Sequence, residues 1–198
     1  MTARRHLADF DALVIGASAG GVQALQLLLR SLHADTRAAV MVVLHLPPDR
    51  PSGLAELLAP QCALPVTEAL DKQPAPRAQV VIAPPDYHLL VEPDGSLALS
   101  VDDPVRYSRP AIDPLFESAA ATYGPGLLAL LLTGGSEDGS AGAAAVRRLG
   151  GTVWVQDPAT AVASTMPASA LALAGADEVL TLPQMCHRLA VAERSTKA

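Results

Sequence analysis

Three polar residues stand directly after apolar, strand-like runs, and together they have the chemistry of an activated hydroxyl. Ser18 lies in the turn Gly16-Ala17-Ser18-Ala19-Gly20, between an apolar run and a helical pattern. His45 closes a second apolar run, and Asp138 lies in the glycine-rich segment after Leu127–Leu132. A serine nucleophile, a histidine that takes its proton and a carboxylate that orients the imidazole are the groups that attack an ester carbonyl. We therefore predict a serine hydrolase with these three catalytic residues.

Each of these residues also has a plainer interpretation. Taken alone, Ser18 suits the N-cap of the following helix, His45 suits a strand end that binds backbone, and Asp138 suits a turn. Glu137 and Asp113 are alternative acids. We favour Asp138 because it lies between the glycine-rich turn and the next helix. We favour the catalytic interpretation because the carboxyl ends of parallel strands meet at one edge of a sheet.

The glycine-rich first loop raises dinucleotide binding as an alternative from another class. That fingerprint needs glycine at its first, third and sixth positions, which here are Gly16, Ser18 and Gly21. The central glycine is missing, and His45 stands where an acid would hold the ribose. Both departures favour the hydrolase, for which we expect no cofactor and no metal.

Composition narrows the classes of protein further. The chain has 198 residues, of which 50% are apolar and only 3% aromatic, and its net charge is −6. An acidic chain is a poor match for a phosphate backbone, so we expect no nucleic-acid partner. No run approaches the roughly 20 apolar residues that span a bilayer, and the N-terminus does not resemble a signal peptide. Cys62 and Cys186 lie far apart without metal-ligand spacing, so we expect a cytoplasmic protein without disulfides.

Short apolar runs alternate with helical patterns along most of the chain. The predicted strands are Ala12–Ile15, Val40–Leu44, Val80–Ala83, Leu127–Leu132, Thr152–Gln156 and Glu178–Leu180. The predicted helices are Gly20–Leu32, Ser52–Ala59, Pro114–Tyr123, Ser140–Leu149, Pro167–Ala174 and Gln184–Arg194. Leu89–Val91 and Leu97–Val101 flank the turn Pro93-Asp94-Gly95, which predicts a hairpin.

This alternation predicts an α/β fold with a doubly wound, mainly parallel, Rossmann-like sheet in three layers, to which the hairpin adds an antiparallel patch. We expect one domain over residues 1–198, with its core at about residues 10–193. The segment between Pro60 and Gln79 is expected to be a surface loop, and Thr196–Ala198 a frayed tail.

Arg109 is a further candidate, because it lies between the hairpin and a predicted helix. A guanidinium there is suited to binding a substrate carboxylate, and its plainer interpretation is a solvated surface arginine.

These motifs resemble those of a known family, the catalytic domain of the chemotaxis receptor-glutamate methylesterases of the CheB type. The matching motifs follow in family order over roughly residues 10 to 193, and they are Ile15–Gly21, His45–Pro48, Ile82–His88, Arg109–Asp113, Leu132–Gly139 and Gln156–Pro167. The resemblance places the family's nucleophile on Ser18, its general base on His45 and its acid on Asp138.

The resemblance implies hydrolysis of glutamate γ-methyl esters on methyl-accepting chemoreceptors, and deamidation of receptor glutamines by the same machinery. The partners would be receptor helices, with no cofactor, no nucleic acid and no membrane insertion. The backbone N–H of Ala19 would serve the oxyanion hole.

Three departures from the family pattern affect these expectations. Ala19 replaces the family's usual threonine, Gly135 stands at the substrate-side position of a methionine, and Glu137 adds charge beside the acid. About ten residues precede the first predicted strand, too few for the family's receiver domain, so we expect no regulation by a receiver domain in cis. A separate response-regulator or methyltransferase protein is a further expected partner. The missing receiver domain and the altered turn before Asp138 keep a non-catalytic, receptor-binding signalling module with this fold as the alternative.

Overall fold

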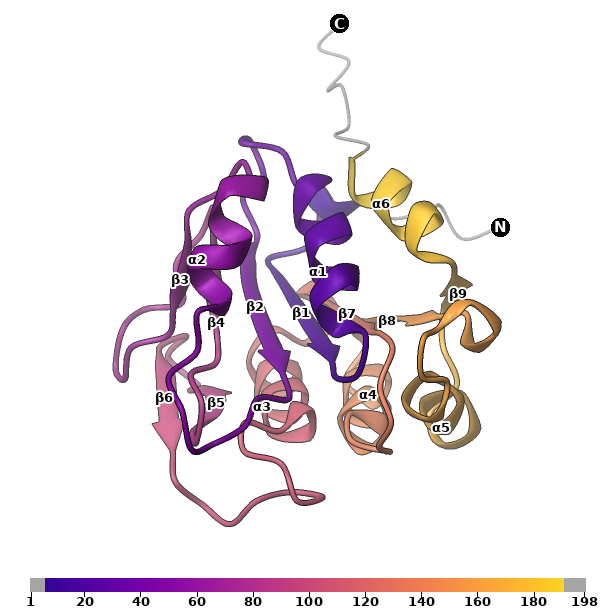
Figure 1. Ribbon diagram of the computed structural model, residues 1–198. Coiled ribbons are helices and arrows are strands. Elements are labelled where there is room, and N and C mark those ends of the chain that lie inside the picture. Colours follow the sequence, from indigo (N-terminus) through magenta and orange to yellow (C-terminus); the bar gives the residue numbers. More distant parts are fainter. Residues whose placement is uncertain (1–5, 191–198) are drawn as a thin grey trace, which may run out of the picture.

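A seven-stranded sheet forms the middle layer of the structure, a computed structural model that describes residues 6–190 (Figure 1). Every pairing within this sheet is parallel. Its strands are β1 (Ala12–Ala17), β2 (Ala39–Leu44), β3 (Val66–Glu68), β4 (Gln79–Ile82), β7 (Leu127–Leu131), β8 (Thr152–Gln156) and β9 (Glu178–Leu180). The central strands β1, β2 and β7 are buried at every position, as expected for parallel strands covered on both faces.

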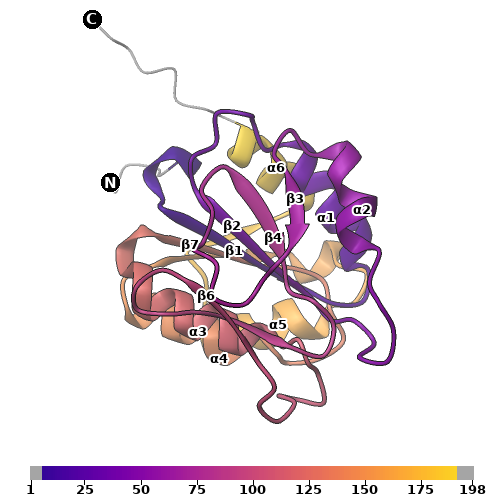
Figure 2. The same cartoon turned by 90° about the vertical axis from the view of Figure 1, so that its left-hand side faces the viewer.

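Helices cover both faces of the sheet, as Figures 1 and 2 show. One face carries α1 (Gly21–Arg30), α2 (Leu54–Leu58) and α6 (Leu182–Ala190), and the other carries α3 (Ile112–Tyr123), α4 (Ser140–Arg148) and α5 (Thr165–Leu173). Each face has its own apolar cluster against the sheet. Short 3₁₀ turns lie at Leu7–Asp9, Ala59–Gln61, Gly124–Gly126 and Pro158–Thr160.

The hairpin is a separate two-stranded antiparallel sheet made of β5 (His88–Val91) and β6 (Leu97–Ser100). It packs against α3, where the Val91 N–H donates a hydrogen bond to the Ser118 hydroxyl at 3.1 Å. The hairpin therefore connects the sheet to the start of α3 by way of the segment that follows β6.

The strand order β3-β4-β2-β1-β7-β8-β9 places β1 and β7 side by side at the centre. From β1 the chain proceeds to β2, then to the edge strand β3 and back to β4 between them, whereas from β7 it proceeds outward on the other side through β8 and β9. The connections after β1 and β7 therefore diverge, which makes this the topological switch point at which α/β sheets bind ligands. Ser18 and the loop that carries Asp138 both lie there.

The predicted α/β fold class is confirmed, and most predicted elements are observed within three residues of their expected bounds. The surface loop expected at residues 60–79 was wrong in part, because it contains the 3₁₀ turn Ala59–Gln61 and strand β3. This edge strand has three residues, of which only Val66 is buried, so the sequence contains no apolar run that would have predicted it. The last helix is observed as Leu182–Ala190, and its predicted continuation and the predicted tail lie outside the described residues.

No helix within residues 6–190 is long and apolar enough to cross a membrane.

Candidate active site

The turn after β1 holds the predicted nucleophile, Ser18. A Cβ atom on Gly16 would lie 2.5 Å from Cγ2 of Ile112, so only glycine lets the start of α3 approach this strand so closely. Gly20 has φ of +79°, which turns the chain into α1 without steric cost. The Ser18 N–H donates to the Thr133 carbonyl at 2.9 Å, which ties the turn to the end of β7. Ser18 is half-buried and Ala19 is exposed.

His45 continues the register of the neighbouring strand β2. Ala17 pairs with Leu44, and the His45 N–H donates to the Ala17 carbonyl at 3.1 Å. Ser18 and His45 are therefore the first residues beyond two paired strands, which run about 4.8 Å apart in a sheet. The side chain of His45 is only 13% exposed.

Asp138 is fully buried and is the centre of the site's hydrogen bonding. Its Oδ2 atom lies 2.7 Å from Nε2 of His45 and accepts the Ile112 N–H at 2.6 Å. Its Oδ1 atom accepts the N–H groups of Asp113 at 3.0 Å and Gly139 at 2.9 Å. Ala111, the N-cap residue of α3, has no side-chain oxygen, so the Asp138 carboxylate satisfies the Ile112 and Asp113 N–H groups instead. A negative charge at a helix N-terminus is also favoured by the helix dipole.

These contacts determine the charge of Asp138. Burial acts to raise its pKa, but the hydrogen bonds from His45 and from the Ile112 and Asp113 N–H groups outweigh burial and lower the pKa below its ordinary value. An ionised carboxylate only accepts hydrogen bonds, so Nε2 of His45 carries the proton. The lone pair of the neutral ring is then on Nδ1.

Nδ1 of His45 faces a serine that sequence analysis did not single out. The Ser108 hydroxyl oxygen lies 3.3 Å from Nδ1. No hydrogen bond joins the Ser18 hydroxyl to the ring within residues 6–190. The structure thus brings His45 and Asp138 into contact and places Ser18 at the adjacent strand end, with the hydroxyl not yet bonded to the base. Catalytic hydrogen bonds are often loose in the free enzyme and tighten when substrate binds.

Thr133 and Gln156 support the Ser18 turn, and sequence analysis missed both. The Thr133 hydroxyl donates to the Ala19 carbonyl at 2.8 Å and accepts the Ala163 N–H at 2.9 Å. The buried Gln156 side chain accepts the Thr133 N–H at 2.9 Å. The Ala19 N–H has no acceptor within the described part of the chain, so it is free to bind an oxyanion. The available signals were a polar residue shortly after β7, Thr133, and a polar residue at the end of β8, Gln156.

The two alternative acids have other partners. The Asp113 carboxylate accepts the Gly142 N–H at 2.7 Å, at the start of α4. Burial, with a smaller contribution from the nearby Asp138 charge, raises the pKa of Asp113 to about 6. Glu137 is exposed and pairs with Arg106 at 2.9 Å. Of the three acids considered, only Asp138 contacts His45.

The two weaker substrate-binding candidates occupy different surroundings. Nε and Nη2 of Arg109 donate to Asp86 Oδ1 at 3.0 and 2.6 Å, and Nη1 donates to the carbonyls of Val101 and Asp102 at 2.8 and 3.0 Å. These contacts favour a structural role over the substrate-binding role that the sequence suggested. Gly135 is exposed, with open space where a side chain would project.

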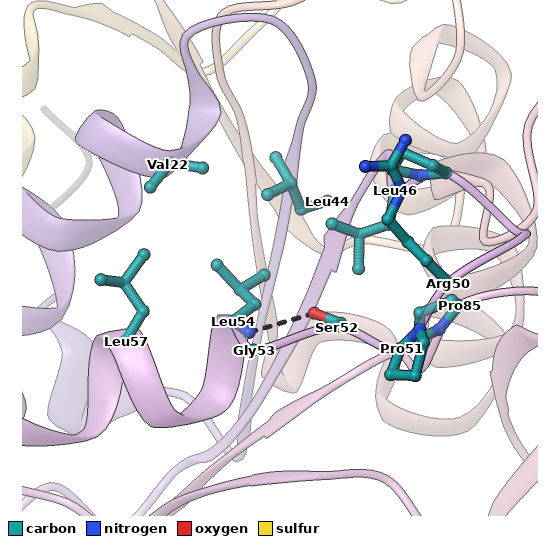
Figure 3. A pocket seen from close by; sticks show the side chains of 11 residues that line it. Val22, Leu44, Leu46, Arg50, Pro51, Ser52, Gly53, Leu54, Leu57 and Pro85 are labelled. Atoms are coloured by element: carbon teal, nitrogen blue, oxygen red, sulfur yellow. Dashed lines mark hydrogen bonds between the residues drawn. The ribbon is translucent and has the colours of Figure 1, made fainter.

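An apolar groove of about 330 Å³ lies between the end of β2 and α2 (Figure 3). Leu44 and Leu46 flank His45 in the sequence, and Figure 3 shows them across the groove from Leu54 and Leu57 of α2. The complete lining is Val22, Leu44, Leu46, Pro47, Arg50, Pro51, Ser52, Gly53, Leu54, Leu57 and Pro85. His45 does not line the groove, whose apolar surface lies on the face of the sheet that carries α1 and α2.

Fold and site together define a doubly wound, Rossmann-like α/β domain with a histidine–aspartate pair and a serine at the switch point of its sheet, an arrangement suited to hydrolysis. The sequence profile of the family described as CheB methylesterase matches residues 13–189. The chain belongs to this CheB methylesterase family, as the sequence resemblance predicted.

Comparison with individual relatives agrees with this assignment. The crystal structure of the Thermotoga maritima CheB methylesterase catalytic domain is similar with a TM-score of 0.86 and 34% identity, over 91% of this chain and 97% of that one. A Leptospira interrogans protein named putative protein-glutamate methylesterase/protein-glutamine glutaminase is 36% identical over 90% of this chain and 93% of its own length. A Nocardioides relative, named protein-glutamate methylesterase/protein-glutamine glutaminase, is 44% identical over 90% of this chain and 50% of its own length. These names favour an enzyme over the non-catalytic module.

Proposed function

We propose that this protein is a serine hydrolase that cleaves glutamate γ-methyl esters on methyl-accepting chemoreceptors and deamidates receptor glutamines. Membership of the CheB methylesterase family and the names of its relatives support the reaction and the substrate. The observation that carries the proposal is the 2.7 Å contact between His45 Nε2 and the buried Asp138 carboxylate, next to the strand end that bears Ser18. A partnered histidine beside a serine is what activates a hydroxyl.

In the first half of the reaction, the Ser18 oxygen attacks the ester carbonyl and its proton moves to Nδ1 of His45. Asp138 stays ionised, holds Nε2–H and stabilises the imidazolium. The Ala19 N–H stabilises the negative charge that develops on the carbonyl oxygen. The bond to the methoxy group then breaks, and that oxygen takes the proton from Nδ1 and leaves as methanol.

In the second half, water attacks the acyl-serine and gives its proton to Nδ1 of His45. The Ser18 oxygen leaves and recovers a proton from the same nitrogen, which releases the glutamate γ-carboxylic acid and restores the enzyme. With a glutamine substrate, the amide nitrogen takes the proton and leaves as ammonia. Every step uses residues of this chain, without a cofactor.

The substrate is then a segment of receptor polypeptide, and the enzyme works in the cytoplasm. The apolar groove between the end of β2 and α2 supports a protein substrate, because its lining can receive apolar side chains of a polypeptide. A separate response-regulator or methyltransferase protein is a further partner in this proposal.

The test is methanol release from methylated receptor fragments. Ser18→Ala should lower kcat by at least about 1,000-fold, because removal of a serine nucleophile leaves only the contributions of binding and the oxyanion hole. Ser31→Ala is the matched control, since Ser31 caps the far end of α1 and its hydroxyl bonds the Leu28 carbonyl. Equal rates for Ser18→Ala and the wild type would refute the assignment.

A further inference from the structure

Ser108 contacts the candidate base from a segment that the proposed reaction does not use. Residues 101–109, which we call the arm, connect β6 to the region before α3 and project beyond both elements in Figure 1. The Ser108 hydroxyl oxygen lies 3.3 Å from Nδ1 of His45, the nitrogen that has to accept the proton of Ser18. The arm therefore reaches the reaction centre from the side opposite Asp138.

The base of the arm is fixed to the hairpin. Arg109 bridges Asp86 and the carbonyls of Val101 and Asp102, which are the first residues of the arm. The ring of His88 lies 3.2 Å from the Asp103 carbonyl through Nε2 and accepts the Ala111 N–H at 3.2 Å through Nδ1. Both ends of the arm are thus held, and the tip is placed by the backbone between them.

The tip is a two-residue turn in an unusual conformation. Val105 and Ser108 form an antiparallel bridge with N–H to carbonyl distances of 3.1 and 2.9 Å. The two central residues, Arg106 and Tyr107, have φ of 47° and 64°. Such turns favour asparagine and glycine, because a side chain in the left-handed region costs about 1–2 kcal/mol. Strain of this kind persists only where the surrounding contacts determine the conformation.

Those contacts form a closed circuit around the imidazole. Asp138 contacts His45, His45 contacts Ser108, and the turn leads from Ser108 to Arg106. Arg106 pairs at 2.9 Å with Glu137, whose neighbour in the chain is Asp138. The imidazole is held between the arm on one side and the acid loop on the other.

We propose that Ser108 is a positioning residue, which holds the His45 ring against Asp138 until Ser18 takes over the bond to Nδ1. The proposal rests on the proposed function, in which Nδ1 is the base atom. In this exchange the bond from His45 to Asp138 has to persist and the bond to Ser108 has to break, and the first is the shorter of the two. The contact with Asp138 is 2.7 Å and charge-assisted, and so it persists, whereas the contact with Ser108 is 3.3 Å and at the long end for a hydroxyl, and so it yields easily.

Kinetics of methanol release test the role. Ser108→Ala should lower kcat by about tenfold with KM within about twofold, since the ring loses a restraint and the substrate loses no contact. Ser108→Thr keeps the hydroxyl and should restore kcat to within about threefold of the wild type. Tyr107→Ala is the matched control, because Tyr107 lies in the same turn and is fully exposed. An unchanged or higher kcat in Ser108→Ala would overturn the proposal, the higher value meaning that Ser108 obstructs the base.

Nitrogen NMR of ¹⁵N-histidine-labelled protein gives a readout that needs no activity. His45→Gln assigns both ring-nitrogen resonances of His45 by their loss, and Nδ1 is the one without an attached proton. The Nδ1 resonance should move toward the position of an unbonded ring nitrogen in Ser108→Ala and return in Ser108→Thr. A resonance that stays in place in Ser108→Ala would contradict the contact. If the wild type released no methanol while this shift occurred, the proposed function would fail and the contact between Ser108 and His45 would stand.

Discussion

The backbone N–H of Asp113 donates to Oδ1 of Asp138 at 3.0 Å, so two carboxyl groups share the N-terminus of α3. They differ in ionisation because they differ in partners. Asp138 accepts hydrogen bonds from His45 and from three backbone N–H groups, whereas Asp113 accepts one from the Gly142 N–H. The pKa of Asp138 is accordingly lowered, and burial raises the pKa of Asp113 to about 6.

The raised pKa of Asp113 predicts that this residue weakens the fold as the pH rises. Between its ordinary pKa of 3.8 and its folded pKa of about 6, the folded state binds more protons than the unfolded state. Its contribution to stability is therefore present below pH 3.8 and is lost as the pH rises through about 6. The shift corresponds to about 3 kcal/mol at 1.36 kcal/mol per unit.

Asp113→Asn mimics the protonated acid and should abolish this dependence. As the pH rises from 4 to 7.5, the variant should become more stable relative to the wild type, by up to about 3 kcal/mol in the free energy of unfolding. Urea denaturation at several pH values measures the difference, in which the other titrating groups cancel. Asp71→Asn serves as the control, since Asp71 is exposed. A constant difference between the Asp113→Asn and wild-type curves would show that Asp113 ionises without cost.

Asp138 predicts the opposite pH effect and a separable catalytic effect. Its lowered pKa means that its stabilisation is present above its ordinary pKa of 3.8 and is lost as the pH falls through the lower folded value. Asp138→Asn should lower kcat by about 10⁴-fold, because an amide does not hold the same tautomer of His45.

Asp138→Ala should also destabilise the fold, by about 3 kcal/mol or more. It leaves the N–H groups of Ile112, Asp113 and Gly139 without an acceptor, and each buried unpaired group costs about 1–3 kcal/mol. Comparing methanol release and urea denaturation for the two variants separates the two roles. If Asp138→Ala were as stable as the wild type, the cap on α3 would be unimportant.

Strand ends made the candidate site predictable from the sequence. Ser18 and His45 each follow an apolar run, and parallel pairing of those runs puts the two residues side by side. Asp138 could be chosen over Asp113 and Glu137 because it lies between a glycine-rich turn and a helix. Long, fully buried strands and their following loops are thus determined by local patterns that a reader of the sequence can see.

Ser108 could not be found in the same way. It is 63 residues from His45, and its position depends on a turn whose central residues, Arg106 and Tyr107, carry no turn signal. Strand β3 was missed for a related reason, since its three residues join the sheet only through the tertiary pairing with β4. Where tertiary contacts determine the local conformation, as in this turn and in β3, the local sequence pattern does not predict it.

Thr133 offers a test of how the Ser18 turn is supported. Thr133→Val keeps the shape of the side chain but removes the hydroxyl that bonds the Ala19 carbonyl and the Ala163 N–H. We expect a loss of about 1–3 kcal/mol in the free energy of unfolding, together with a lower kcat, because the Ala19 N–H would lose its fixed direction. Thr133→Ser should recover both. A variant that lost stability and kept full kcat would limit Thr133 to the fold.

The ion pair between Arg106 and Glu137 predicts a coupling with Ser108. Both side chains are about half exposed, so the pair itself should contribute little stability, about 0.2–1 kcal/mol. Its effect on catalysis should pass through Ser108, because the turn joins Arg106 to the residue that contacts Nδ1 of His45. Arg106→Ala or Glu137→Gln should therefore lower kcat by two- to threefold in the wild type and have no effect in the Ser108→Ala background. A double-mutant cycle on kcat measures this coupling, with Arg77→Ala as a control for loss of an exposed arginine from an exposed ion pair. Additive effects of the two changes would mean that Arg106 acts on the substrate or on Asp138 directly, and that the arm does not transmit its position to the imidazole.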